Sequence, residues 1–314
     1  MNYTIPVYVP AGKVSEYQSS GGWSNFTNYK SQVNFVQDSN DQWSDDFNWS
    51  SWEVPTSEDV VCITDNCQLD MDADVLYVYM RNDDDVLTIN SGHTLNTTYG
   101  VHIENASKLV VEDGGQVKSD IPFCGTVQKH IDAYTSNDDG WNFIASPVTE
   151  ELVTAEVPGL IPTGGTVYDY YYLEEESTTW RNYKNHTFTT KPNQGYLYAN
   201  VAGTTINFSG TMQPYVAEGV SIPLTKEGEG WNLVGNPFTF NAYANKPYYV
   251  INGRNVEAAA SGAIAPCTGI VVKAEGTANE TVKFTKEAPA GSSAPNNGNL
   301  HVVLTEANCT LLTT

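Results

Sequence analysis

Short apolar runs separated by Asp, Asn and Gly dominate the chain between residues 56 and 124. Four such runs, each of four or five residues and rich in β-branched side chains, lie at 59–63, 75–79, 86–89 and 108–111. Runs of this length, bounded by turn-forming residues, predict strands. We therefore expect a series of short β-strands joined by tight turns.

Two segments of this region repeat one pattern. Residues 87–95 and 109–117 share Leu-x-[Ile/Val]-x-x-Gly-x-x-[Leu/Val] at an offset of 22 residues. A period of this length with two or three strands per repeat suits one coil of a parallel β-helix, in which inward apolar residues stack and Gly forms a tight corner. An antiparallel meander is the alternative. We favour a short right-handed parallel β-helix over residues 56–124.

A second repeat organises the rest of the chain. Residues 140–148 (GWNFIASPV) and 230–238 (GWNLVGNPF) share Gly-Trp-Asn-apolar-apolar-small-polar-Pro-apolar. The match extends from 195–200 to 269–274, and from 205–209 to 281–285. In this pattern a strand begins at Trp and ends at Pro, because Pro cannot donate to a β-ladder.

Two copies of a half-sheet cannot each bury an apolar face alone, so they are expected to pack against each other. The sequence thus predicts an all-β protein with three parts. They are an aromatic-rich cap at 1–55, the β-helix at 56–124, and a pseudo-duplicated β-sandwich or jelly-roll-like domain at 125–314. The two copies within the last part lie at about 139–226 and 229–290.

The two copies differ most in a tyrosine-rich segment at 167–183. Two β-prone runs flank the polar tip 174–179, which predicts a hairpin. The period-two rule places Tyr168, Tyr170 and Tyr172 on one face and Tyr171 on the other. The counterpart at 247–253 is shorter, so a function specific to this chain is expected near the long hairpin.

The first 55 residues carry Trp23, Trp43 and Trp49 in polar, irregular surroundings. These rings could form a patch for stacking on sugars, or they could close the open end of the β-helix core. Trp has the largest apolar area of any side chain and an open β core needs a lid, so we favour the cap.

The balance of charge limits the classes of partner that the protein is expected to bind. Fifteen Lys and Arg stand against 37 Asp and Glu, for a formal net charge of −22. So acidic a surface repels phosphate backbones and anionic lipid, which argues against nucleic-acid and membrane-surface partners. No apolar run is long enough to span a membrane, and the N-terminus has no signal-peptide pattern. Either the protein stays inside the cell, or a signal peptide has been removed.

Five cysteines leave one unpaired under any disulfide scheme. Cys62 and Cys67 are close enough in sequence to bridge a tight turn, and free buried thiols are the alternative. The lack of a Cys-x-x-Cys pair argues against a structural zinc site.

Catalytic patterns are sparse. The five histidines belong to no metal-binding pattern, and we find no nucleophile elbow and no phosphate-binding loop. Asp83, Asp84 and Asp85 lie at a predicted corner, and paired carboxylates can hydrolyse glycosides, but 37 acids produce close pairs by chance. The triplet Asp70, Asp72 and Asp74 lacks the Gly and distal Glu of a calcium loop. We expect no catalysis, no cofactor and no metal.

The first resemblance to a known group lies between about residues 40 and 120. Trp43-Ser44, Asn48-Trp49-Ser50, Pro55-Thr56 and the run 59–63 resemble the entry into short β-helical segments of surface and adhesin-like proteins from Bacteroidetes. This resemblance implies an extracellular protein that begins with a solenoid-like region.

The second resemblance lies in the duplicated half. Residues 230–238, 195–198, 206–210 and 264–273 look like the GWNLVGNP-type region of large secreted proteins of Bacteroidetes, often exported by the type IX system. In that group the region is a non-catalytic module near the C-terminus. A recognisable sorting domain is not seen after 300–304, so we expect a fragment of a longer polypeptide.

These observations predict a non-catalytic, secreted or cell-surface, adhesin-like protein. Its expected partner is a glycan or a protein, and the sequence leaves the oligomeric state open. Tyr171, Trp180 and Tyr183 are the candidate ligand-binding residues, because rigid aromatics on an exposed strand suit sugar stacking and protein hot spots. Alternatively, these rings pack across the sandwich. The competing functions are a polysaccharide-degrading enzyme with paired carboxylates and a structural spacer in a longer surface polypeptide.

Overall fold

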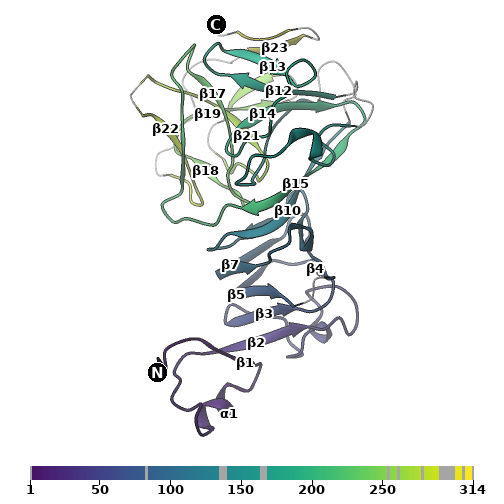
Figure 1. Cartoon of the computed structure of the whole chain (residues 1–314), viewed down its shortest axis with the longest axis vertical. Coiled ribbons are helices and arrows are strands. Elements are labelled where there is room, and N and C mark those ends of the chain that lie inside the picture. Colours follow the sequence, from purple (N-terminus) through teal and green to yellow (C-terminus); the bar gives the residue numbers. More distant parts are fainter. Residues whose placement is uncertain are drawn as a thin grey trace. The chain divides into compact units, whose positions relative to one another are not determined.

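The computed structural model describes residues 2–81, 84–133, 140–162, 168–252, 255–259, 262–276 and 279–289, and the backbone of 301–305 and 308–312. Within these ranges, regular structure is almost all β-strand, with the single α-helix α1 (Val14–Ser19) and three short 3-10 helices, η1 (Asp46–Asn48), η2 (Ala106–Lys108) and η3 (Thr154–Glu156). The expected all-β class is confirmed. The chain divides into two compact units, Met1–Thr126 and Val127–Thr314 (Figure 1).

The first unit is built from two parallel ladders. One has the strand order β1 (Val7–Pro10), β2 (Tyr29–Phe35), β3 (Asp59–Ile63), β5 (Ala73–Met80), β7 (Thr94–His102) and β9 (Gln116–Lys118). The other contains β4 (Cys67–Leu69), β6 (Leu87–Ile89) and β8 (Leu109–Val111). Strand β10 (Phe123–Ile131) begins in this unit and ends in the second. The chain alternates between the ladders, so each passage adds one strand to each.

The registers explain the repeat seen in the sequence. Leu87 pairs with Leu109 and Thr94 with Gln116, which in both ladders places partners 22 residues apart. Because the ladders are parallel, the antiparallel meander is excluded for this segment. Leu69, Ile89 and Val111 occupy the same position of successive strands and are fully buried. These ladders support the parallel β-helix, whose right-handedness stays a prediction.

The segment expected to cap this solenoid also contributes strands. β1 and β2 come from the first 55 residues, and β2 pairs in parallel with β3, so the sheet continues through the expected boundary. Trp43 and Trp49 are buried and meet edge to face, at 4.7 Å between ring centroids. This is the position expected of core rings rather than of a sugar-binding patch.

Of the two alternatives left open for Cys62 and Cys67, the structure has the free thiols. Cys62 lies in β3 and Cys67 in β4, and both are buried thiols without a disulfide. Burial raises the pKa of both thiols, so both stay protonated and unreactive at neutral pH. Cys309 and His301 lie in strands whose side chains are outside the described residues.

The second unit contains two four-stranded antiparallel sheets with the same connectivity. The first has the order β11 (Asn142–Ala145), β14 (Gly195–Asn200), β12 (Tyr168–Glu174) and β13 (Thr179–Asn182). The second has the order β17 (Trp231–Gly235), β21 (Gly269–Lys273), β19 (Tyr248–Asn252) and β20 (Asn255–Ala259). Each sheet starts with a Gly-Trp-Asn strand, pairs it with the Gly-initiated strand, and then adds the hairpin. The duplication therefore extends to topology.

The remaining strands of the two copies pair differently. β22 (Thr281–Thr285) pairs with β16 (Val220–Pro223) and β18 (Tyr243–Ala244) in the second copy. In the first copy, β15 (Thr204–Met212) lies beside β10, where Gln128 Nε2 donates to Asn207 Oδ1 at 3.0 Å. β23 (His301–Thr305) and β24 (Asn308–Leu312) form an antiparallel pair.

The two sheets share one core, as a sandwich requires. The first copy contributes Phe143, Tyr171, Leu173, Trp180 and Leu197, and the second contributes Trp231, Leu233, Tyr249, Val256 and Val271. The Trp of each motif meets the tyrosine of its own hairpin: Trp141 lies 6.2 Å from Tyr171 and Trp231 lies 5.6 Å from Tyr249, between ring centroids. The Gly-Trp-Asn motif therefore marks the start of each half of the sandwich.

Candidate functional site

The copies meet through a reciprocal pair of turns, and this junction shapes the candidate site. In the first copy the turn Pro-Asn-Gln-Gly ends at Gly195, and Asn193 has a φ of 63°. In the second copy the turn Pro-Cys-Thr-Gly ends at Gly269, and Cys267 has a φ of 56°. The backbone N–H of Gly235 donates to the Asn193 carbonyl at 2.9 Å, and that of Ala145 donates to the Cys267 carbonyl at 3.0 Å. Each turn thus caps the Gly-Trp-Asn strand of the opposite copy.

An open groove of about 630 Å³ lies beside the first of these turns. Its lining comes from the long hairpin (Tyr172, Leu173, Glu174, Glu175, Glu176), from the turn (Lys191, Pro192, Asn193, Gln194) and from the second copy (Ile222, Pro223, Thr225, Leu233, Val234). The groove therefore combines three carboxylates and one amine with an apolar floor. It lies entirely within the second unit, where the two copies differ most in sequence.

The hairpin wall is held by a clamp across its own two strands. β12 and β13 pair with Glu174 opposite Thr179, and Arg181 Nη2 contacts Glu174 Oε2 at 2.7 Å. Ser177 also donates to that carboxylate, and these bonds hold the pKa of Glu174 below its usual range. Because its charge is satisfied by Arg181, Glu174 orders the tip of the hairpin.

The tip of this hairpin rests on the second copy. The backbone N–H of Glu229 donates to Thr178 Oγ1 at 3.2 Å. Gly228 has a φ of 58°, and a Cβ there would come within 2.7 Å of the Glu175 carbonyl oxygen, so only glycine allows this close approach. The tip is thereby fixed immediately before the second Gly-Trp-Asn motif.

Glu175 is the groove residue with the most altered ionisation. Burial raises its pKa to about 7, and a hydrogen bond from the Leu233 backbone opposes part of that rise. The cause is desolvation of the carboxylate beside the apolar floor, where the ionised form loses hydration. Near neutral pH this side chain can therefore act as a proton donor or as a charged acceptor.

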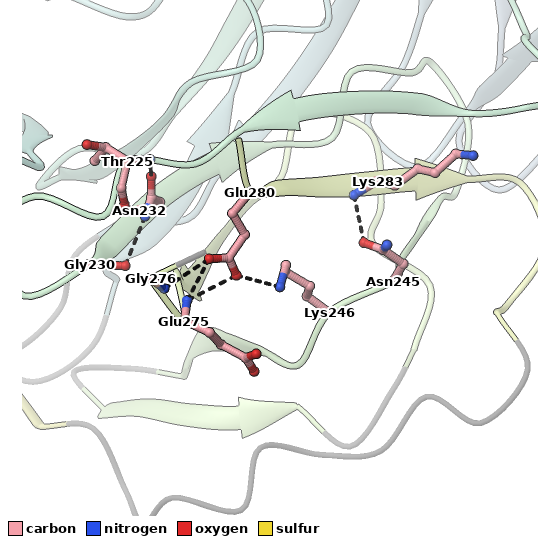
Figure 2. A network of polar contacts seen from close by, with 9 residues as sticks. All are labelled: Thr225, Gly230, Asn232, Asn245, Lys246, Glu275, Gly276, Glu280 and Lys283. Atoms are coloured by element: carbon pink, nitrogen blue, oxygen red, sulfur yellow. Dashed lines mark hydrogen bonds and ion pairs between the residues drawn. The ribbon is translucent and has the colours of Figure 1, made fainter. Parts of the chain in front are cut away.

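The segment around Thr225 is fixed by the Asn that the two copies of the repeat motif share. Asn232 Oδ1 accepts from the Thr225 N–H at 2.7 Å, while its Nδ2 donates to the Thr225 and Gly230 carbonyls at 2.9 Å (Figure 2). In the first copy Asn142 Nδ2 donates to the Gly140 carbonyl at 3.0 Å. The motif Asn thus closes its own turn in both copies, and in the second copy it also positions a groove residue.

A second polar cluster supports this copy away from the groove. Glu280 contacts Lys246 at 2.7 Å and accepts from the backbone N–H groups of Glu275 and Gly276 (Figure 2). These bonds lower the pKa of Glu280 to about 2. Because these contacts hold the backbone of Glu275 and Gly276 beside Lys246, we assign Glu280 a structural role.

The aromatic residues selected from sequence lie elsewhere. Tyr171 and Trp180 are buried in the core that the two sheets share, and Tyr183 is half-buried against Tyr170 and Phe188. The expected exposure is therefore wrong for Tyr171 and Trp180, because residues on that face of the hairpin meet the opposing sheet. Ligand binding by these three residues stays a prediction. The exposed strand on which that prediction was based is not found for Tyr171 and Trp180.

Two of the carboxylates singled out from sequence accept hydrogen bonds from backbone N–H groups, whereas Asp85 Oδ2 is buried without a hydrogen-bond partner among the described residues. Asp70 accepts from the Ser44 N–H at 2.9 Å, and Asp72 accepts from the Thr94 N–H at 2.8 Å. Asp83 lies outside the described residues. No group of three or more His, Cys, Asp or Glu side chains that could hold a metal is found in the part of the chain that the structure describes.

Sequence reasoning missed the groove residues because they have no motif. Glu175, Asn193 and Thr225 are ordinary turn residues, and only the packing of two copies brings them together. The one usable signal was the acidic tip of the first hairpin, at the point where the copies diverge.

Comparisons with known proteins give a family without a described activity. A family described as a domain of unknown function (DUF8693) matches residues 35–246. No curated protein and no solved structure matches the chain. No helix within the described ranges is long and apolar enough to cross a membrane. Since the family match covers more than half of the sequence, the chain belongs to the family described as a domain of unknown function, DUF8693.

Proposed function

We propose that this protein is a non-catalytic, adhesin-like protein of the cell surface or extracellular space, and that it binds a basic segment of a partner protein in the groove between its two copies. The observation that carries the proposal is the groove itself, with Glu175 and Glu176 above the apolar residues Ile222 and Leu233. The resemblance of the repeat motifs to secreted proteins of Bacteroidetes supports the location.

Charge favours a basic ligand. The protein has a net charge of −22, and the groove carries three glutamates against Lys191. Electrostatic complementarity of this kind speeds encounter and selects among partners. A Lys or Arg side chain can lay its aliphatic stem along Ile222 and Pro223 while its charged head meets Glu175. An anionic ligand would meet repulsion at the same site.

The decisive experiment measures binding of the full chain to an array of short basic, neutral and acidic peptides. We expect basic peptides to bind, and Glu175→Gln to weaken that binding roughly tenfold, the effect of losing one charge-assisted hydrogen bond of about 1.5 kcal/mol. Glu104→Gln replaces a carboxylate by the same amide at an exposed position in the first unit and serves as the control. Equal binding by both variants would show that the groove is not the site.

The same binding should depend on pH through Glu175. Its pKa in the free protein is about 7, and a bound cation lowers it, so binding releases a proton. Affinity for a basic peptide should therefore rise as pH increases toward 7 and level off above it. Titration calorimetry between about pH 5.5 and 8.5, which spans roughly 1.5 units on either side of that pKa, should show this slope for the native chain and a smaller slope for Glu175→Gln. An unchanged slope would contradict the assignment.

One observation favours a second candidate function. Glu174 and Glu175 are neighbours whose pKa values are displaced in opposite directions, which is the arrangement of an acid and an ionised partner in glycoside hydrolysis. The Glu174 carboxylate, however, is bound to Arg181 and Ser177 of its own hairpin. Release of reducing ends from a polysaccharide panel, abolished in Glu175→Gln, would establish the enzyme instead. Absence of both peptide binding and hydrolysis would favour a spacer.

A further inference from the structure

Two aromatic side chains of the first unit, Phe47 and Trp52, are exposed to solvent. Phe47 is 59% exposed and Trp52 is 63% exposed, although both belong to the segment whose other tryptophans, Trp43 and Trp49, are buried. Their ring centroids lie 5.8 Å apart at an interplanar angle of 89°. The rings therefore contact each other edge to face, while more than half of each residue's surface stays exposed.

The backbone beneath these rings is rigidly attached to the sheet. Trp49 Nε1 donates to the Trp43 carbonyl at 2.7 Å, and the N–H of Ser50 donates to the Asn34 carbonyl at 2.9 Å. Asn48 is fully buried, and its side chain accepts from the N–H groups of Ser39 and Asn40 and donates to the Gln42 carbonyl. The exposed rings thus flank an anchored Asn-Trp pair.

The loop also holds Trp52 in a conformation that its side chain does not favour. Trp52 has a φ of 59°, in the left-handed region that bulky residues rarely adopt. Its N–H donates to the Trp49 carbonyl at 2.9 Å, and Asp46 Oδ1 accepts from the Val54 N–H across the loop. A strained backbone around an exposed aromatic side chain is a pattern found at functional sites.

From these contacts we propose that Phe47 and Trp52 form a platform for a neutral glycan, on which a pyranose ring stacks. The C–H face of a sugar ring is weakly positive and meets the negative face of an aromatic ring favourably. Asp46 and Glu53 are exposed beside the rings and supply acceptors for sugar hydroxyls. The anchored loop needs little ordering when the ligand binds.

Among the ligands that bind to aromatic side chains, the charge of the protein favours a neutral glycan. The net charge of −22 and the neighbouring acids Asp45, Asp46 and Glu53 repel nucleic acid, sulfated or sialylated glycans and anionic lipid. An uncharged chain of sugars carries hydroxyl donors for the carboxylates and apolar ring faces for the aromatics. The platform thereby matches a neutral polysaccharide in both respects.

Affinity electrophoresis of the full chain in gels containing soluble β-glucan, xylan or galactomannan tests the proposal. We expect at least one of these neutral polysaccharides to retard the protein, and Trp52→Ala to reduce the retardation at least tenfold in apparent affinity. Phe47→Ala should weaken it, while Phe47→Tyr should retain it. Trp23→Ala removes another exposed ring, 44% exposed, and should leave retardation unchanged.

Several outcomes would overturn the proposal. They are retardation of Trp52→Ala equal to that of the native chain, an equal loss in Trp23→Ala, and no retardation by any of the three polysaccharides. Circular dichroism and a thermal melt of each variant check that it is folded. Glu175→Gln should bind polysaccharide as the native chain does. A negative result for polysaccharide binding therefore says nothing about peptide binding in the groove, and the two proposals are tested separately.

Discussion

At the scale of single residues, buried polar side chains fix several turns in the described part of the chain. Asn236 is fully buried, and its Nδ2 donates to the carbonyls of Phe240, Ile264 and Ala265 while its Oδ1 accepts from the Phe238 N–H. In the first copy, Ser146 Oγ accepts from the Val148 N–H at the equivalent position. A buried polar side chain is stable only when its partners are all present, which explains the small-polar-Pro positions of the repeat.

Glu280 offers a test of stability at this scale. We expect Glu280→Gln to lower the free energy of unfolding by about 1–3 kcal/mol at pH 7, because it removes charge-assisted hydrogen bonds and leaves Lys246 without its ion pair. Only 5% of the Glu280 side chain and 19% of the Lys246 side chain are exposed, so water has little access to the ion pair. Urea denaturation measures the loss.

The pH dependence of that loss has a definite sign. The folded pKa of Glu280 is about 2, below the ordinary value of 4.5, so its contribution is complete above pH 4.5 and decreases as pH falls toward 2. The gap between Glu280→Gln and the native chain should therefore narrow in acid. Glu275→Gln, an exposed neighbour that contributes only its backbone N–H, should be neutral. A gap that stays constant with pH would contradict the assigned ion pair.

At the scale of elements, the strand ends that meet across the two copies are the most constrained parts of the sandwich. Gly235 ends β17 and Ala145 ends β11, and a Cβ on Gly235 would overlap the Cβ of Ala145. A Cβ on Gly195 would come within 2.9 Å of Leu233 Cγ. Small residues at these positions let the two sheets approach closely. The turn of each copy can then accept a hydrogen bond from the strand end of the other copy.

This junction predicts a rescue by exchange of residues. Gly235→Ala should lower the free energy of unfolding by about 1–3 kcal/mol through overpacking. Because Ala145 is the equivalent residue of the other copy, the double variant Ala145→Gly with Gly235→Ala should regain most of that stability.

Chemical denaturation of the two single variants and the double variant measures the coupling. Gly21→Ala, where a Cβ would meet nothing within 4 Å, should change stability by less than about 0.5 kcal/mol. Additive losses in the double variant would show that the two strand ends do not share one contact.

The elements also show which structural features could be predicted from the sequence. The 22-residue offset between 87–95 and 109–117 predicts the parallel register, because stacked inward side chains must recur at the coil length. The repeated Gly-Trp-Asn strand predicts two equivalent sheets. Exposure along the hairpin could not be predicted in the same way, since Tyr171 is covered by residues more than fifty positions away, such as Trp231 and Leu233.

At the scale of the whole molecule, the net charge of −22 is a source of self-repulsion. Salt shortens the range of this repulsion to about 10 Å at 0.1 M. We therefore expect the melting temperature to rise by roughly 2–4 °C between low salt and a few tenths molar sodium chloride, at neutral pH, because unfavourable surface charge is screened. Differential scanning calorimetry measures the shift.

Choline chloride at matched ionic strength should give the same rise, since the effect depends on ionic strength. A rise with sodium alone would instead indicate specific ion binding. A fall in melting temperature would mean that attractive ion pairs such as Lys246 with Glu280 outweigh the repulsion.

The sequence by itself determined the all-β class, the 22-residue register and the duplication, because each is written in the local spacing of apolar, turn and repeated residues. The tertiary structure alone decided which aromatic rings face water and which line the core. Trp49 and Trp52 lie three residues apart, yet one is buried and the other is 63% exposed. Likewise burial raises the pKa of Glu175 to about 7, although nothing in its local sequence indicates that it is buried. Burial depends on what distant segments cover, and local sequence carries no record of that.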